Sequence, residues 1–90
     1  MSLELIVFAR RFVEGSLSAE AFSDPYMAQW KEERDLNKLK DDSASVSECA
    51  SSIFVLADCF NPESDRDADE LDEVGLKQEV EATLRKFGFL

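Results

Sequence analysis

The feature that most constrains the fold is a run of apolar residues at helical spacing in the middle of the chain. Between residues 46 and 60, such residues recur every three or four positions: Val46, Cys49, Ala50, Ile53, Phe54, Ala57 and Phe60. This spacing places their side chains on one face of an α-helix. Ser43 or Ser45 can cap that helix, because a serine hydroxyl accepts a hydrogen bond from a free backbone N–H. We expect this helix to be the most apolar of the chain and to form the centre of the core.

Two further helices are predicted before it. The first runs from Leu3 to Val13, with Ser2 as its cap and Gly15 as its stop. Its inner face carries Leu5, Phe8, Ala9, Phe12 and Val13. The second opens near Ser18, and we expect Asp24-Pro25 to kink or restart it, because proline lacks the backbone N–H that a helix interior uses. Its apolar stripe comprises Phe22, Tyr26, Trp30 and Leu39, and we interpret Trp30 as a core residue rather than a contact residue.

The last predicted helix begins near Asp72 and ends near Gly88. One face carries Leu76, Val80, Leu84 and Phe87. Residues 40–45 have the composition of a loop, and no segment has a convincing strand pattern. Ninety residues suffice for one domain with its own core. The sequence therefore predicts an all-α protein, a single domain over residues 1–90 with the fold of an antiparallel four-helix bundle.

Between the last two helices lies a stretch with a large excess of negative charge. Residues 58–73 contain one base, Arg66, and eight acids: Asp58, Glu63, Asp65, Asp67, Asp69, Glu70, Asp72 and Glu73. The whole chain has twenty acids and ten bases, a formal net charge of -10. Like charges repel one another and lower stability, so we expect a positively charged partner. We expect no binding to nucleic acid or membranes, since both are anionic. Asp72 and Glu73 also suit the positive N-terminal end of the last helix.

The residue types present argue against an enzyme. The chain has no histidine, no Gly-x-Ser-x-Gly motif and no glycine-rich phosphate loop. Two cysteines cannot form a zinc site. On one helix, Cys49 and Cys59 would lie about 15 Å apart along the axis, beyond disulfide reach. Reduced thiols, together with a start that lacks a basic signal-peptide region, lead us to expect a cytoplasmic protein. We also expect no cofactor.

Calcium is the chemical alternative that the acidic stretch suggests. Asp65-x-Asp67-x-Asp69 resembles the opening of an EF-hand loop. Glu70, however, stands where that loop needs a glycine for its sharp turn, and Leu76 stands where it needs a bidentate glutamate. We therefore predict no specific metal site and only weak, nonspecific attraction of divalent ions.

The C-terminal half also carries a more specific pattern. It reads Phe60-Asn-Pro-Glu-Ser-Asp-Arg66, then Gly75-Leu-Lys-Gln-Glu-Val80, then Leu84-Arg-Lys-Phe87, with Glu70 and Asp72 between the first two segments. This pattern, about a third of the chain, closely resembles the C-terminal half of the colicin D immunity proteins. The N-terminal half is similar only in outline, at Glu20-Ala-Phe-Ser23.

The resemblance implies a four-helix bundle that binds the C-terminal nuclease domain of a cognate bacteriocin, an enzyme that cleaves transfer RNA in its anticodon loop. In that family, acids at the end of the third helix and in the following loop fill the positive active-site cleft in place of RNA phosphates. The matching acids here are Asp58, Glu63 and Asp65, whereas Asn61 stands where an acid is expected. Asp67, Asp69 and Glu70 are expected to add electrostatic steering. The full set of expected partner-binding residues is therefore Asp58, Asn61, Glu63, Asp65, Asp67, Asp69 and Glu70.

Two other functions stay open at this point. One is a metal-binding module built on the acidic stretch. The other is a helical adaptor or oligomer subunit that binds through the face carrying Tyr26 and Trp30. We expect Arg66 to pair with neighbouring acids and to shape the loop rather than to contact a partner.

Overall fold

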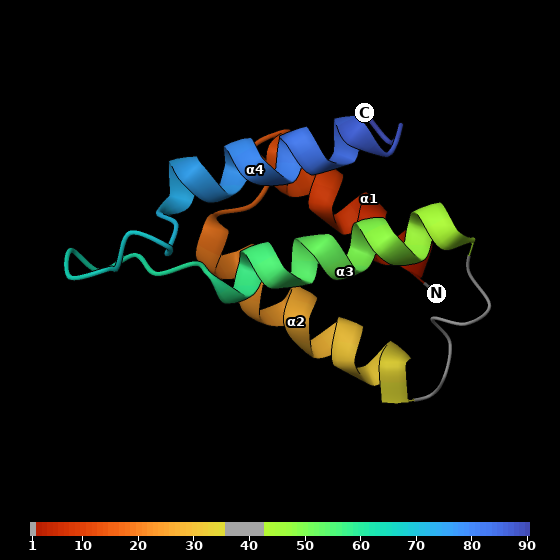
Figure 1. Cartoon of the computed structure of the whole chain (residues 1–90), viewed down its shortest axis with the longest axis horizontal. Helices are drawn as coiled ribbons and strands as arrows, with labels where there is room; N and C mark the ends of the chain where they lie inside the picture. The colour runs from red at the N-terminus through yellow and green to blue at the C-terminus, as the bar shows by residue number, and fades with distance from the viewer. Residues whose placement is uncertain (1, 36–42) are drawn as a thin grey trace.

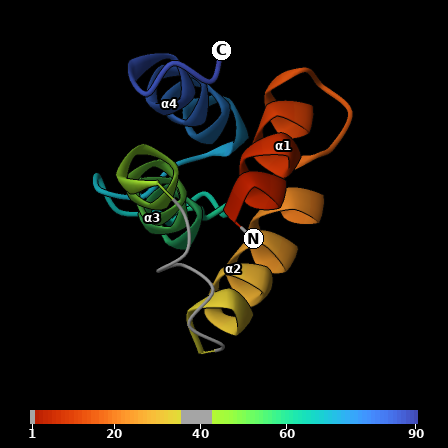
Figure 2. The ribbon, with the colours of Figure 1, turned by 90° about the vertical axis from the view of Figure 1, so that its right-hand side faces the viewer.

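The computed structural model describes residues 2–35 and 43–90, and these form four helices (Figure 1). In chain order they are α1 (Ser2–Val13), α2 (Ala19–Asp35), α3 (Ala44–Asp58) and α4 (Glu73–Lys86). Figure 2 shows the four helices arranged around a shared centre, with α1 and α3 each in contact with all the others. The predicted all-α class and helical bundle are confirmed. None of the helices in the described ranges has the length and apolar character needed to cross a membrane.

All four helices contribute to one hydrophobic core. Its fully or almost fully buried members are Leu5, Ile6, Ala9, Phe12, Ala19, Phe22, Tyr26, Cys49, Ala50, Ile53, Leu76, Val80 and Leu84. The rings of Phe12 and Phe22 stack with centroids 4.5 Å apart. The Tyr26 hydroxyl donates a 2.6 Å hydrogen bond to the backbone carbonyl of Ala50, which satisfies this buried polar group. The apolar face predicted for the middle of the chain is confirmed as the contribution of α3 to this core, except that Phe60, the last residue predicted for that face, lies beyond the end of α3.

Helix α2 does not restart at Pro25, which was one of the two outcomes expected for Asp24-Pro25. The helix is continuous from Ala19 to Asp35, with Pro25 inside it. A proline there removes the hydrogen bond that an N–H would donate to the carbonyl of residue 21. Phe22 and Tyr26, on either side of the exposed Pro25, are fully buried. Their packing outweighs the lost bond, as tertiary burial commonly does.

Trp30 lies further along α2 and is half-buried. Its ring packs on that of Phe54 of α3, with centroids 4.3 Å apart, which agrees with its interpretation as a core residue. Leu39, the last member of the predicted stripe, and residues 40–42 of the predicted loop lie outside the described residues.

The ends of the helices follow ordinary capping chemistry. After α1, Gly15 adopts a φ of 92°, and the backbone N–H groups of Gly15 and Ser16 donate to the carbonyls of Phe12 and Arg11. This is a Schellman motif, in which glycine tolerates the left-handed conformation. Gly88 ends α4 in the same way. At the start of α3, the Ser43 hydroxyl accepts from the N–H of Val46, as expected. Ser2 is itself the first residue of α1 rather than a flanking cap.

Candidate functional site

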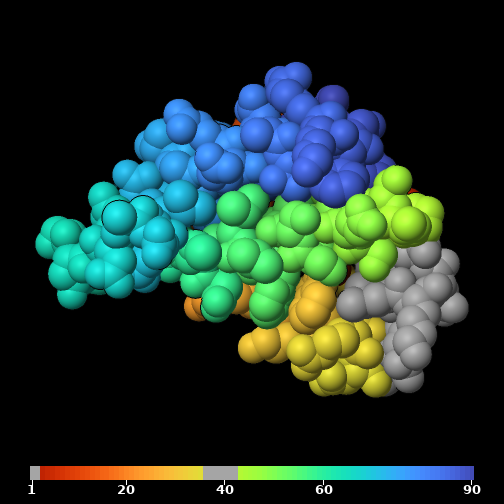
Figure 3. Space-filling view, viewed as in Figure 1, coloured from red at the N-terminus to blue at the C-terminus, as the bar shows by residue number. Residues whose placement is uncertain are grey.

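The loop between α3 and α4, residues 59–72, is held closed at its base and is called the acidic loop below. The N–H of Leu71 donates to the carbonyl of Cys59, and the N–H of Asn61 donates to the carbonyl of Leu71, both at 2.8 Å. These two bonds pair Phe60 with Leu71 in an isolated parallel β-bridge. Both side chains are half-buried against the core. Apolar anchoring at both ends therefore leaves residues 61–70 to extend beyond the helices, as the teal segment of Figure 1 and the lobe in Figure 3 show.

Two consecutive turns shape the extended part of the acidic loop. The N–H of Arg66 donates to the carbonyl of Glu63, and the N–H of Glu70 donates to the carbonyl of Asp67. In such four-residue turns the two central residues form the corner, and the second of these is an acid in both turns. Asp65 holds that position in the first turn and Asp69 in the second. The turns therefore direct acidic residues to the outside of the loop.

Five carboxylates of the predicted set face solvent. Asp58, at the end of α3, is exposed, and so are Glu63, Asp65, Asp67 and Asp69. Within residues 2–35 and 43–90, no lysine or arginine lies within ion-pair distance of any of them. Asp58 also stands near the negative end of the α3 dipole, which has no base in its last turn. These five negative charges are neutralised by nothing in the described part of the chain.

Asn61 and Glu70, the other two predicted contacts, are half-buried and bonded inside the loop. Glu70 Oε1 accepts hydrogen bonds from Asn61 Nδ2 at 3.3 Å and from the N–H of Asp67 at 2.9 Å. These bonds, the Asp67 bond first, hold the pKa of Glu70 below its usual value. Asn61 Oδ1 in turn accepts from the N–H of Glu63 at 2.9 Å. This bracing was not predicted, and its one local sign in the sequence is Asn61-Pro62, since asparagine before proline favours such a turn.

Arg66 pairs inside the loop, as predicted. Its Nη1 donates to the carbonyl of Glu63 at 2.8 Å, and its Nη2 lies 3.6 Å from Asp72 Oδ2. The other oxygen of Asp72, Oδ1, accepts from the N–H of Gly75 at 2.7 Å and caps α4. Asp72 is therefore a structural residue, as its position in the sequence predicted, and Arg66 ties the first turn of the loop to the start of α4.

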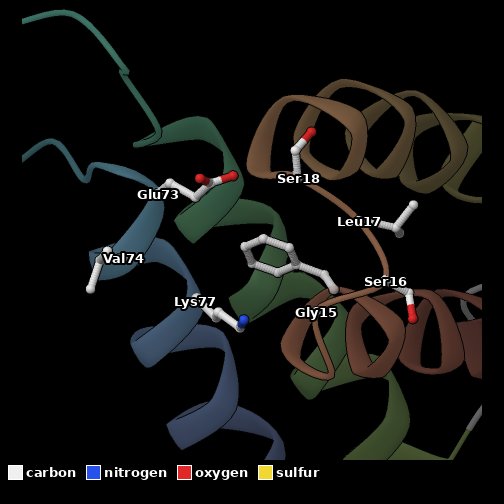
Figure 4. Close-up of a pocket in the computed structure, with 8 residues that line it drawn as sticks. Gly15, Ser16, Leu17, Ser18, Glu73, Val74 and Lys77 are labelled. Carbon is white, nitrogen blue, oxygen red and sulfur yellow. The ribbon is translucent and has the colours of Figure 1, made fainter.

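A cavity of about 440 Å³ lies on the other side of the α4 start, against the turn between α1 and α2 (Figure 4). Its lining residues are Phe12, Gly15, Ser16, Leu17, Ser18, Glu73, Val74 and Lys77. Glu73 points across the cavity to α2, where its Oε1 accepts from the N–H of Ala19 at 2.6 Å. Ser18 caps the same helix by accepting from the N–H of Ala21. Glu73 and Ser18 thus satisfy the start of α2, and the residues that line the cavity include no nucleophile paired with a base.

Metal binding by the acidic loop is the next possibility to compare with the structure. In the described ranges, no three His, Cys, Asp or Glu side chains gather closely enough to hold a metal ion, and this includes the spaced aspartates of the acidic loop. Tyr26, part of the face considered for the alternative adaptor function, is fully buried in the core, so its side chain offers no exposed contact surface.

The family of the chain is shown by comparison with known proteins. A comparison with curated proteins found no significant match. The sequence model of a family described as "Bacterial self-protective colicin-like immunity" matches residues 1–87, almost the entire chain. A match of this extent covers all four helices and the acidic loop. The chain therefore belongs to the family of bacterial self-protective, colicin-like immunity proteins.

Proposed function

We propose that this bacteriocin immunity protein binds the nuclease domain of a cognate, colicin D-like toxin and blocks its positively charged active site, with acidic side chains in the place of tRNA phosphates. The contacts are Asp58 at the end of α3 and Glu63 and Asp65 in the first turn of the acidic loop. Asp67 and Asp69 add long-range attraction. The protein acts in the cytoplasm and catalyses nothing itself.

The observation that carries this proposal is the set of five exposed, unneutralised carboxylates on and beside a closed loop. An enzyme that cleaves RNA presents lysine and arginine to bind phosphates. Carboxylates can form charge-assisted hydrogen bonds with the same groups, and opposite charge accelerates the encounter. Because α3 and the closed loop already hold these acids in place, little ordering is required when they bind.

The test is charge reversal at the proposed contacts. Asp58, Glu63 and Asp65 are changed together to lysine, and binding to the nuclease domain of the toxin encoded next to this gene is measured with protection of tRNA from cleavage. We expect the triple variant to lose protection and to retain its helical circular dichroism, because all three side chains are exposed and bonded to no other side chain.

A matched variant controls for the change in net charge. Glu14, Asp24 and Glu79 are exposed acids on other parts of the surface, and their change to lysine alters the total charge equally. This control should still protect tRNA, apart from a slower association. Full protection by the first triple variant would refute the contact assignment, and failure of the wild-type chain to bind the toxin domain would refute the proposed function.

A further inference from the structure

Two members of the predicted contact set differ from the other five in their surroundings. Asn61 and Glu70 are half-buried, whereas Asp58, Glu63, Asp65, Asp67 and Asp69 are exposed. Glu70 Oε1 joins the two turns of the acidic loop, because it accepts from Asn61 Nδ2 before the first turn and from the N–H of Asp67 at the start of the second. Asn61 Oδ1 also fixes the N–H of Glu63. Together these three hydrogen bonds form what we call the Asn61–Glu70 clasp.

We propose that Asn61 and Glu70 are positioning residues, which do not contact the toxin but hold the exposed acids in the arrangement that binds it. This inference rests on the proposed function above. The acids of the loop repel one another, and the repulsion favours open loop conformations in which they spread apart. The clasp opposes that spreading by hydrogen bonds between the two turns. Arg66 assists it through the carbonyl of Glu63 and the carboxylate of Asp72.

The chemistry of the clasp also accounts for a neutral amide at position 61. Asn61 uses its oxygen as an acceptor for the Glu63 N–H and its nitrogen as a donor to Glu70. An ionised aspartate could accept the first bond but has no proton to donate for the second. Its charge would also repel Glu70, whose Oε1 lies 3.3 Å from the side-chain nitrogen of Asn61. A direct contact with a cationic toxin would favour an acid here, whereas the clasp requires an amide.

Conservative substitutions separate the two roles of Glu70. Glu70→Gln keeps an oxygen that can accept both hydrogen bonds but removes the charge, whereas Glu70→Ala removes both. Because a preformed loop has less ordering to complete on binding, we expect affinity for the toxin nuclease domain to remain within about threefold of wild type in Glu70→Gln and to fall about tenfold in Glu70→Ala. Equal losses in the two variants would show that the charge itself contacts the toxin and would overturn the positioning role.

Position 61 gives an independent test, because a contact role and a positioning role predict opposite effects of Asn61→Asp on affinity. If Asn61 faced the toxin, Asn61→Asp would add an attractive charge and tighten binding. We expect instead that Asn61→Asp weakens affinity about tenfold, as Asn61→Ala does, because both lose the donor to Glu70. Glu79→Gln and Glu79→Ala, at an exposed acid of α4 outside the loop, control for the loss of one charge and should leave affinity unchanged. Tighter binding by Asn61→Asp would contradict the clasp.

Amide hydrogen exchange, measured by NMR on the free chain, tests the clasp without the toxin. The Asp67 N–H should be protected in the wild type and in Glu70→Gln and should exchange about tenfold faster in Glu70→Ala, while core amides of α3 stay unchanged. Unchanged exchange at Asp67 in Glu70→Ala would refute the bracing. A wild-type chain that does not bind the toxin would overturn the proposed function, whereas a wild type that binds no better than Glu70→Ala would overturn the positioning role alone.

Discussion

Cys49 is a titratable residue with no exposed surface, packed in the middle of α3. Burial raises the pKa of its thiol to about 11, whereas an unfolded cysteine ionises near pH 8.5, about its ordinary value. Between these values the unfolded chain releases this proton and the folded chain retains it. The unfolded state therefore gains stability as pH rises, and the folded state is favoured most fully below pH 8.5, roughly the unfolded pKa.

We predict that the free energy of unfolding falls above about pH 8.5, by up to about 1.4 kcal/mol per pH unit from this group. Urea unfolding at intervals from about pH 7 to pH 10 would measure the decline, since ordinary tyrosines ionise only near pH 10. Burial also raises the pKa of Tyr26, which adds a similar loss at higher pH. Cys49→Ala is the control and should give a flatter curve. Parallel curves for the two chains would contradict the prediction.

Single residues of the acidic loop differ in how far the sequence could specify their roles. The exposure of Asp65 and Asp69 could be expected, because acids in a polar stretch between two helices are ordinarily solvated. The bond from Asn61 to Glu70 could not, since it joins residues nine positions apart and exists only when two turns and the bridge at Leu71 form together. The excess of acids therefore predicted where the candidate site lies, the family resemblance implied its contact residues, and turn geometry divided it into exposed acids and internal braces.

At the scale of helices, the apolar spacing was informative where one face of a helix is buried. It predicted α1, α3 and α4 close to their observed limits, because burial of one face imposes the helical period on the sequence. Local rules also predicted the Gly15 stop and a cap at Ser43 or Ser45, of which Ser43 is the cap observed. They predicted a kink or a restart at Pro25, and the restart does not occur, because the buried aromatic residues on both sides hold α2 together. Long-range packing of this kind cannot be read from neighbouring residues alone.

The continuity of α2 leads to a prediction about Pro25. Alanine at this position can restore the hydrogen bond to the carbonyl of residue 21 and fits the helix at an exposed site. A proline inside a helix costs about 3 kcal/mol, of which its restriction of the unfolded chain offsets up to about 1 kcal/mol. We expect Pro25→Ala to raise the free energy of unfolding by about 2 kcal/mol, as measured by urea denaturation.

Pro62 is the matched control for this substitution. It is exposed and lies in the acidic loop, outside any helix, so Pro62→Ala restores no helical hydrogen bond. We expect that change to leave stability unaltered or slightly lower, because the unfolded chain becomes more flexible. A loss of stability in Pro25→Ala would show that the proline is an adapted feature of α2 rather than a tolerated defect.

The whole molecule combines an ordinary helical core with a net charge of -10. The start of α4 is held against the start of α2 by the hydrogen bond that the Ala19 N–H donates to Glu73. The same bundle therefore fixes both ends of the acidic loop. Repulsion among the acids destabilises the free chain and, in the proposed complex, becomes attraction to a cationic surface.

Salt should therefore act on the free chain and on the complex in opposite directions. Raising the ionic strength shortens the Debye length from about 10 Å at 0.1 M to about 3 Å at 1 M, which screens both interactions. We predict that the melting temperature of the free chain rises with sodium chloride, while its association rate with the toxin nuclease domain falls at least about tenfold between low and high salt. Circular dichroism melts and stopped-flow mixing measure the two quantities.

The triple lysine variant at Asp58, Glu63 and Asp65 supplies the internal comparison. It removes part of the repulsion that salt would screen, so its melting temperature should start higher than that of the wild type and respond less to sodium chloride. The melting temperature of the wild type could instead be independent of salt while its association rate falls. That result would show that the charges affect only the rate of association with the toxin. It would contradict the prediction that repulsion in the acidic loop lowers the stability of the free chain.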